Sequence, residues 1–178
     1  MERKRENEII ARVQAGMTGE FELLVRSYQN GLFRFAANLV ERAIAEDLVQ
    51  DIFLAAYAQI HTFDPRRGTF RAWIYRMARN RALNLRKKKK EYLHSDPPEM
   101  VDDRTPSRDL LTREAFRRLD QALNDLSFRD RVVFVLAELE GLPYAEIARI
   151  EDLALGTVKS RLARIKIKLR NILRPYVN

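Results

Sequence analysis

Apolar residues recur every three or four positions through most of the chain, which is the period of an amphipathic α-helix. Near the C-terminus the spacing runs four, three, four and three through Val158, Leu162, Ile165, Leu169 and Ile172. A second stripe lies earlier in the chain and comprises Leu48, Val49, Ile52, Phe53, Ala56 and Ile60. Glycines number only six and β-branched residues rarely cluster, so strand signals are weak. The pattern predicts an all-α fold.

Caps and breakers predict where the helices of the N-terminal half begin and end. Gly16 can end a first helix and Thr18 can cap the next one. The dipeptide Asn30-Gly31 predicts an interruption. Thr69 can cap a long helix that begins at Phe70. The helices expected before it are 8–14, 21–29, 32–40 and 45–60.

The last third of the chain predicts a helix-turn-helix. Ser127 and Asp130 resemble a capping box, and Gly141 can end the helix that they start. Pro143 can occupy the first position of a short helix, 144–150, and a longer basic helix follows from Leu155. A short helix, a turn and a basic second helix form the arrangement that enters the major groove of DNA.

The exposed face of that second helix carries the candidate base-reading side chains. The residues that point away from its apolar stripe are Lys159, Ser160, Ala163, Arg164 and Ile167, with Arg161 on the flank. The alternative is a three-helix bundle with a solvated basic face. We favour DNA binding, because the small residues Ser160 and Ala163 permit close approach to bases.

A second basic segment extends from Phe63 to Lys90 and has no acidic residue after Pro65. One face of its helix is apolar and comprises Phe70, Trp73, Ile74, Met77, Ala78 and Leu85. The opposite face comprises Tyr75, Arg76, Arg79, Leu83 and Arg86. Arg81 falls in the apolar line, so either the helix leaves the core near Ala78 or Arg81 finds a buried carboxylate. Two interpretations of this segment are open. One is an amphipathic surface helix with a solvated basic end, and the other is a nucleic-acid site whose aromatic side chains stack on unpaired bases. We favour the nucleic-acid site.

The helix expected at 45–60 presents an acidic face in a chain that is otherwise basic. Its outward side chains are Asp47, Gln50, Asp51, Leu54 and Ala58. Acids near a helix start also suit the helix dipole, and Asp47 can have that role alone. An exposed Leu54 among carboxylates is better explained by a basic, partly apolar protein partner.

Composition separates two domains and limits the function classes. Residues 91–107 contain three prolines, several acids and little apolar content, which predicts a flexible acidic linker. We expect an N-terminal domain at 1–92, the linker at 93–110 and a helix-turn-helix domain at 111–178. The linker acids can lie on the basic helix as a nucleic-acid mimic or simply keep the tether soluble; the residues favour the second reading.

The net charge of +8 and the pI near 10.0 predict an anionic partner. The chain has no cysteine, which excludes disulfides and cysteine-ligated metals and is compatible with a reducing compartment. No signal peptide and no membrane-spanning run are recognised, so we expect a cytoplasmic protein without a cofactor or a metal. The two histidines, His61 and His94, stand apart without a catalytic setting, so an enzyme such as a nuclease is disfavoured.

Three segments together resemble bacterial RNA polymerase sigma factors of the extracytoplasmic-function (ECF) group. Residues 47–53 resemble the family's polymerase-binding helix, and residues 69–80 resemble its promoter −10 segment. Residues 142–148 and 156–162 resemble its −35 helix-turn-helix. The resemblance covers nearly the whole chain. It implies a protein without catalysis that binds core RNA polymerase at the β′ clamp helices and the β flap, recognises both promoter elements and helps to melt DNA. An anti-sigma protein is a further implied partner.

The resemblance also implies roles for individual residues. The residues implied to bind polymerase are Asp47, Gln50, Asp51 and Leu54. Those implied at the −10 element are Phe63, Arg66, Arg67, Thr69, Arg76, Arg79, Asn80 and Asn84, with the loop 63–69 holding a flipped base. Those implied at the −35 element are Thr157, Lys159, Ser160, Arg161, Ala163 and Arg164, with Arg161 on phosphate. The resemblance also favours the linker acids as nucleic-acid mimics.

The chain departs from the family pattern at three places. Pro143 stands where the family often has Ser or Thr. The stretch Leu153-Ala154-Leu155 lacks the Gly or Pro of the family's turn, which indicates a helical extension there. At the position of Ala163 the family often has a larger residue, which indicates a weak −35 contact there. A rival reading is a stand-alone helix-turn-helix regulator, which explains the C-terminal half but neither the second basic segment nor the acidic face at Leu54.

Overall fold

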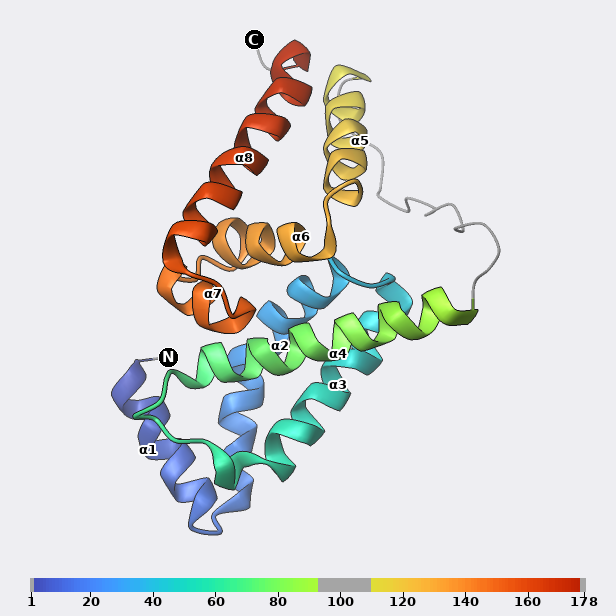
Figure 1. Ribbon diagram of the computed structural model, residues 1–178. Helices are drawn as coiled ribbons and strands as arrows, with labels where there is room; N and C mark the ends of the chain where they lie inside the picture. Colours follow the sequence, from blue (N-terminus) through green and yellow to red (C-terminus); the bar gives the residue numbers. More distant parts are fainter. Residues whose placement is uncertain (1, 93–109, 177–178) are drawn as a thin grey trace.

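The protein folds into two groups of helices that pack against each other across one long helix (Figure 1). The computed structural model describes residues 2–92 and 110–176, and the regular structure of these residues is all helical, as predicted. The first group comprises α1 (Arg3–Gln14), α2 (Phe21–Ala37), α3 (Arg42–Ala58) and α4 (Phe70–Tyr92). The second comprises α5 (Leu110–Asn124), α6 (Phe128–Phe134), α7 (Tyr144–Glu151) and α8 (Leu155–Leu173). The predicted acidic linker lies outside the described residues.

Helix α2 runs without a break through Asn30 and Gly31, so the prediction of two helices at 21–29 and 32–40 was wrong. Leu24, Leu32 and Phe35 lie on one face of this helix and are fully buried. A glycine within a helix costs about 1 kcal/mol relative to alanine. Burial of each of these side chains contributes about 1.5–3 kcal/mol, so the continuous apolar face outweighs the breaker.

Other helix ends follow the expected chemistry in part. Gly16 has a φ of +100° just after α1, as its predicted role as a helix terminator requires. The Thr69 hydroxyl accepts a hydrogen bond from the backbone N–H of Ala72 at 3.1 Å, which confirms that cap. Thr18 does not cap α2, because a short 3-10 turn (Thr18–Glu20) intervenes. Helix α1 begins at Arg3 rather than Glu8, and α3 spans Arg42–Ala58 rather than 45–60, with Ile60 in a second 3-10 turn (Ile60–Thr62).

The C-terminal domain is the predicted helix-turn-helix with a π-helical turn before it. The Ser127 hydroxyl accepts from the N–H of Asp130 at 3.2 Å, as predicted, and starts α6. The chain then forms a π turn (Val135–Leu139), and Gly141, at a φ of +61°, redirects the backbone toward α7. Pro143 is extended and precedes α7 instead of occupying its first turn. A 3-10 turn (Arg174–Tyr176) follows α8.

The turn between α7 and α8 corrects the predicted helical extension at residues 153–155. Asp152 has a φ of +54° and a ψ of +54°, the left-handed conformation that aspartate tolerates better than most residues. The N–H of Leu153 donates to the carbonyl of Ala148 at 2.9 Å, which closes the end of α7. The turn therefore forms without glycine or proline, because Asp152 supplies the unusual backbone angle.

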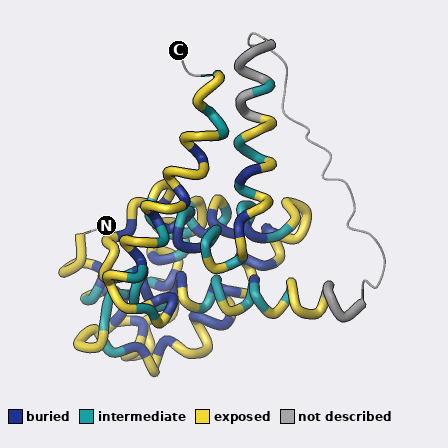
Figure 2. The backbone as a smooth tube through the Cα atoms, turned by 45° about the horizontal axis from the view of Figure 1, so that its top comes forward, coloured by how far each residue is buried: buried dark blue, intermediate teal, exposed yellow. Residues whose placement is uncertain are grey.

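The two domains share one continuous hydrophobic core (Figure 2). It contains Phe35, Tyr75 and Ala78 of the first domain together with Leu136 and Ile147 of the second. A smaller cluster, which comprises Ala122, Leu126, Ile165 and Leu169, joins α5 to α8. Packing of α7 on α4 therefore gives a closed arrangement, in which one face of α4 lies on its own domain and another lies on the helix-turn-helix domain.

Candidate nucleic-acid and protein interfaces

The long helix α4 has its predicted apolar face in the core, but part of its predicted solvent face is also buried. Phe70 and Ile74 are fully buried as expected. Tyr75 was expected on the open face, yet it is only 2% exposed, because the C-terminal domain covers it. Ala82 is buried, so the helix does not leave the core near Ala78. Arg81 is partly exposed and borders a shallow hollow of about 380 Å³ between α3 and α4 instead of entering the core.

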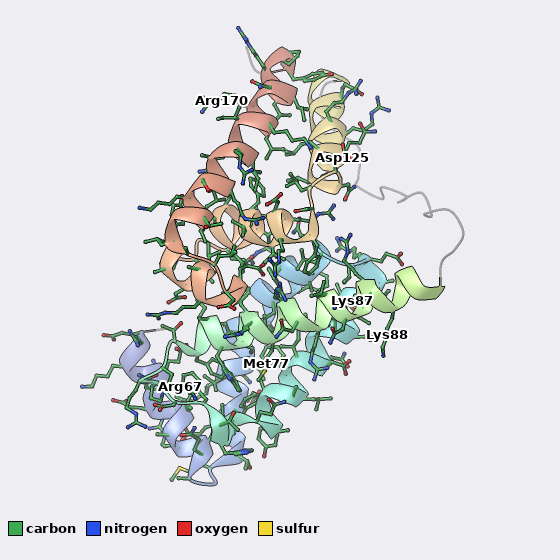
Figure 3. The ribbon with its side chains drawn as sticks, viewed as in Figure 1. Arg67, Met77, Lys87, Lys88, Asp125 and Arg170 are labelled. Carbon is green, nitrogen blue, oxygen red and sulfur yellow. The ribbon has the colours of Figure 1, made fainter. Side chains whose placement is uncertain are left out.

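Among the residues implied at the −10 element, Arg76, Asn80 and Asn84 are exposed on α4. Arg79 is different, because its Nε donates to the Glu151 carboxylate at 2.7 Å and its side chain is 12% exposed. Figure 3 shows Lys87 and Lys88 at the end of α4 that points away from α1. The basic helix therefore offers an open polar strip beside a strip that the second domain occupies.

The loop before α4 is held by aromatic packing. The rings of Phe63, Phe70 and Trp73 contact one another, with centroids 5.5–5.6 Å apart. Phe63 is buried, so its ring supports the loop and does not offer an open face to a base. Phe70 and Trp73 thus lie on the predicted apolar face, whereas the burial of Phe63 does not fit a ring that stacks on unpaired bases.

The same loop presents cations at its tip. The backbone N–H and guanidinium of Arg66 both donate to Asp64, at 3.0 Å and 2.9–3.2 Å, and these bonds lower the pKa of the Asp64 carboxyl. Arg67 is exposed (Figure 3). Thr69 uses its hydroxyl to cap α4. Of the four loop residues implied at the −10 element, the two arginines are the ones that the surface presents.

The acidic face of α3 is assembled as the sequence predicted. Asp47, Gln50, Asp51 and Leu54 are all exposed, and Leu54 is 68% exposed. Tyr57 extends this surface one turn further and is 41% exposed, with its ring edge against Phe21 at 5.2 Å between centroids. Tyr57 was missed in the sequence, although its position three residues after Leu54 places it on the same face. We refer to Asp47, Gln50, Asp51, Leu54 and Tyr57 as the α3 face.

Helix α8, the second helix of the helix-turn-helix, also has the predicted orientation. Its apolar stripe is buried from Val158 to Leu169, and Ile172 is partly buried. The five residues predicted to point outward, Lys159, Ser160, Ala163, Arg164 and Ile167, are all exposed, and Thr157 is partly buried. Arg161 is not free for phosphate in this arrangement, because its guanidinium donates to Asp130 at 2.8 Å within the domain.

The contacts between the domains involve residues that the sequence did not reveal. Glu140 accepts from Arg34 at 3.0 and 3.2 Å and from the Tyr75 hydroxyl at 2.7 Å. A guanidinium N–H of Arg71 donates to the backbone carbonyl of Glu140. Burial, with the hydrogen bond to Glu140, raises the pKa of the Tyr75 hydroxyl. No local sequence signal marks Glu140 or Glu151, because their partners lie 65 to 106 residues away.

The family of the two helical domains is identified by two matches, which place the chain in the sigma-70 class of RNA polymerase subunits. Residues 24–92 match the family described as Sigma-70 region 2, and residues 116–169 match Sigma-70, region 4. The ECF RNA polymerase sigma-E factor of Haemophilus influenzae is 32% identical over 181 residues, and the match covers 95% of each chain. The sigma-E factor of Escherichia coli K12 is 30% identical over 190 residues, and the match covers 95% of this chain and 94% of that protein. The chain belongs to the extracytoplasmic-function family of RNA polymerase sigma factors.

Two solved structures resemble most of the chain. CnrH, in complex with the cytosolic domain of CnrY, has a TM-score of 0.72 at 26% identity; the match covers 94% of this chain and 96% of CnrH. RpoE from Bartonella quintana, in complex with the anti-sigma factor NepR, has a TM-score of 0.69 at 28% identity; the match covers 87% of this chain and 97% of RpoE. Among residues 2–92 and 110–176, no helix is long and apolar enough to cross a membrane.

Proposed function

We propose that the chain directs promoter-specific transcription initiation by joining core RNA polymerase through the α3 face and by contacting two promoter elements through α4 and α8. The observation that carries the proposal is the exposure of Leu54 among Asp47, Gln50 and Asp51 in a protein of net charge +8. An apolar side chain ringed by acids suits a basic, partly apolar partner and gives no advantage to a free protein. In this proposal the partner is the clamp-helix region of the β′ subunit.

At the −10 element, the proposal assigns the open polar strip of α4 to DNA. Arg76, Asn80 and Asn84 project from this strip, and Arg66 and Arg67 extend it along the preceding loop. Guanidinium groups suit phosphates, and side-chain amides suit base edges. Phe63 and Thr69 hold the loop in place, the first by packing and the second by capping. In the closed arrangement five polar residues are thus open to DNA, whereas Arg79, the remaining −10 candidate, is paired with Glu151.

At the −35 element, the exposed end of α8 enters the major groove in this proposal. Lys159 and Arg164 donate to guanine or phosphate, Ser160 to several bases, and Ala163 meets a thymine methyl. Two DNA modules on one chain gain affinity through effective concentration when polymerase holds both in place. The protein performs no catalysis of its own here, and its work is in the cytoplasm with the polymerase and an anti-sigma protein.

The test is co-elution with bacterial core RNA polymerase in gel filtration. The wild-type chain is expected to co-elute, and Asp51→Arg/Leu54→Arg is expected to elute alone, because it replaces an acid and an apolar anchor with cations. The matched control is Glu22→Arg/Leu23→Arg, since Glu22 and Leu23 are also exposed but lie on α2. Loss of association in both double variants contradicts a specific α3 site. If the wild type ignores polymerase and binds a palindromic duplex as a dimer, the stand-alone regulator replaces this proposal.

A further inference from the structure

We propose that the helix-turn-helix domain inhibits the −10 helix in cis: Glu140 and Glu151 occupy cations on α4 and α2 that DNA phosphates would otherwise attract. The inference rests on the proposed function, because it concerns access to the promoter-binding face of α4. It adds a closed state and names the contacts that hold it. We call Glu140, Glu151 and their partners in the N-terminal domain the carboxylate latch.

The Arg79–Glu151 pair is the first half of the latch. The Glu151 side chain has no exposure, and its two oxygens accept from Arg79 at 2.7 and 3.4 Å. A carboxylate that accepts two N–H groups of one guanidinium uses the geometry with which arginine binds phosphate. Glu151 lies at the last position of α7, directly before the helix-turn-helix turn. The domain that is proposed to read −35 thus carries the anion that covers a residue implied at −10.

Glu140 forms the second half, at the end of the π turn. Its side chain is 2% exposed and contacts Arg34 of α2 and Tyr75 of α4. The backbone carbonyl of the same residue accepts from Arg71 of α4. The extra residue of the π turn and the positive φ of Gly141 place both acceptors of Glu140 against the N-terminal domain. Three cationic or polar groups of the N-terminal domain therefore converge on one residue of the C-terminal domain.

The latch is selective in what it covers. The α3 face is exposed, and so are Lys159 and Arg164 on α8. Among these candidate surfaces in the described part of the chain, the strip of α4 that contains Tyr75 and Arg79 is the closed one. Polymerase can therefore meet the α3 face while the chain is still closed, whereas DNA cannot reach Arg79.

The closed state weakens the apparent affinity of the chain for DNA. When only a fraction of molecules is open, the apparent dissociation constant rises by the inverse of that fraction. A chain that is open one time in ten binds DNA about tenfold more weakly than an always-open chain. Removing the latch carboxylates without changing the size of their side chains should recover that factor.

The test uses the full-length chain without polymerase. Because the sequence has no cysteine, two can be introduced for a donor and an acceptor dye at exposed positions on the two domains, Gln29→Cys and Gln121→Cys. Energy transfer between the dyes then reports domain separation. The latch variant is Glu140→Gln/Glu151→Gln. The matched control is Glu138→Gln/Asp152→Asn, which removes the same charge from the same domain at exposed residues, one of them paired with Lys166 inside the domain.

The second readout is binding of a short fluorescein-labelled single-stranded DNA of mixed sequence at one fixed salt concentration. We expect the latch variant to lose energy transfer and to bind this DNA at least about tenfold more tightly than the control variant, or about 1.4 kcal/mol. The control isolates the general gain from two fewer negative charges. Circular dichroism on the same samples checks folding, and the single variants Glu140→Gln and Glu151→Gln are measured if the double variant loses helix.

Two results overturn the inference. Unchanged energy transfer in the latch variants shows that the carboxylates do not hold the domains together. Domain separation with DNA binding no tighter than in the control shows that the latch does not guard a DNA site. Failure of the proposed function is a separate result, since the polymerase co-elution experiment measures the α3 face and none of the latch residues.

Discussion

The replacement Gly31→Ala tests the closed packing through a single methyl group. In the middle of an exposed helix, this change stabilises a protein by about 1 kcal/mol through helix propensity. Gly31 lies in the middle of α2, but a Cβ at this position would lie 2.6 Å from the Tyr75 hydroxyl and 2.8 Å from an Oε of Glu140. Both distances are shorter than real Cβ contacts, so one of these groups must move.

Neither group can move freely. The Tyr75 ring packs edge-on against Phe35 with centroids 5.3 Å apart, and the Glu140 carboxylate is held by Arg34 and by Tyr75 itself. Losing a hydrogen bond to a charged acceptor costs about 1.5–3 kcal/mol, and overpacking costs about 1–3 kcal/mol. These costs are alternative responses to one methyl group, so either of them, less the propensity gain of about 1 kcal/mol, leaves a net destabilisation of up to about 2 kcal/mol. For a chain of this length, that lowers the melting temperature by up to roughly 8 °C.

The assay is thermal unfolding followed by circular dichroism at one protein concentration. The matched control is Gly156→Ala in the first turn of α8, where an added Cβ would meet nothing within 4 Å. We expect the control to be neutral or slightly stabilising. If Gly31→Ala raises the melting temperature as much as the control does, the domains do not approach each other at Tyr75 and Glu140, and the latch loses its structural basis.

Two further predictions concern single side chains. Burial raises the pKa of Glu6, which accepts a hydrogen bond from Tyr28, so the folded protein holds this proton more tightly than the unfolded chain does. The protonated Glu6 contributes stability below the ordinary pKa of the carboxyl, and this contribution is lost as the pH rises through the raised pKa. Glu6→Gln should therefore increase the free energy of unfolding at neutral pH. In urea titrations, this advantage should be lost at about pH 4. Arg164→Ala should weaken holoenzyme binding to a −35 duplex by about 1–3 kcal/mol with an unchanged melting temperature, because Arg164 is exposed. Arg161→Ala should instead lower the melting temperature, since Arg161 is bound to Asp130; the reverse pattern in filter binding and thermal unfolding contradicts the assignment of the two arginines.

Local sequence patterns were sufficient for the all-α class and for the surfaces that point outward. The apolar stripe of α8 predicted which of its residues are exposed, and the stripe of α3 predicted the acidic face around Leu54. These predictions depend on the helical period alone, because burial of the apolar stripe determines that the opposite side of the helix faces outward. The caps at Thr69 and Ser127 were also readable, because a hydroxyl and its N–H partner lie three residues apart.

Tertiary structure decided which cationic faces are free. A local pattern cannot distinguish an arginine or tyrosine that faces DNA or water from one that faces another domain. For this reason, the sequence assigned Tyr75 and Arg79 of α4 to an open surface. Their carboxylate partners lie 65 and 72 residues further along the chain. The glycine in α2 was likewise read as a helix breaker, whereas its lack of a side chain admits Tyr75 and Glu140. Helix formation is governed by neighbours within one or two turns, but domain packing is governed by contacts that no local pattern records.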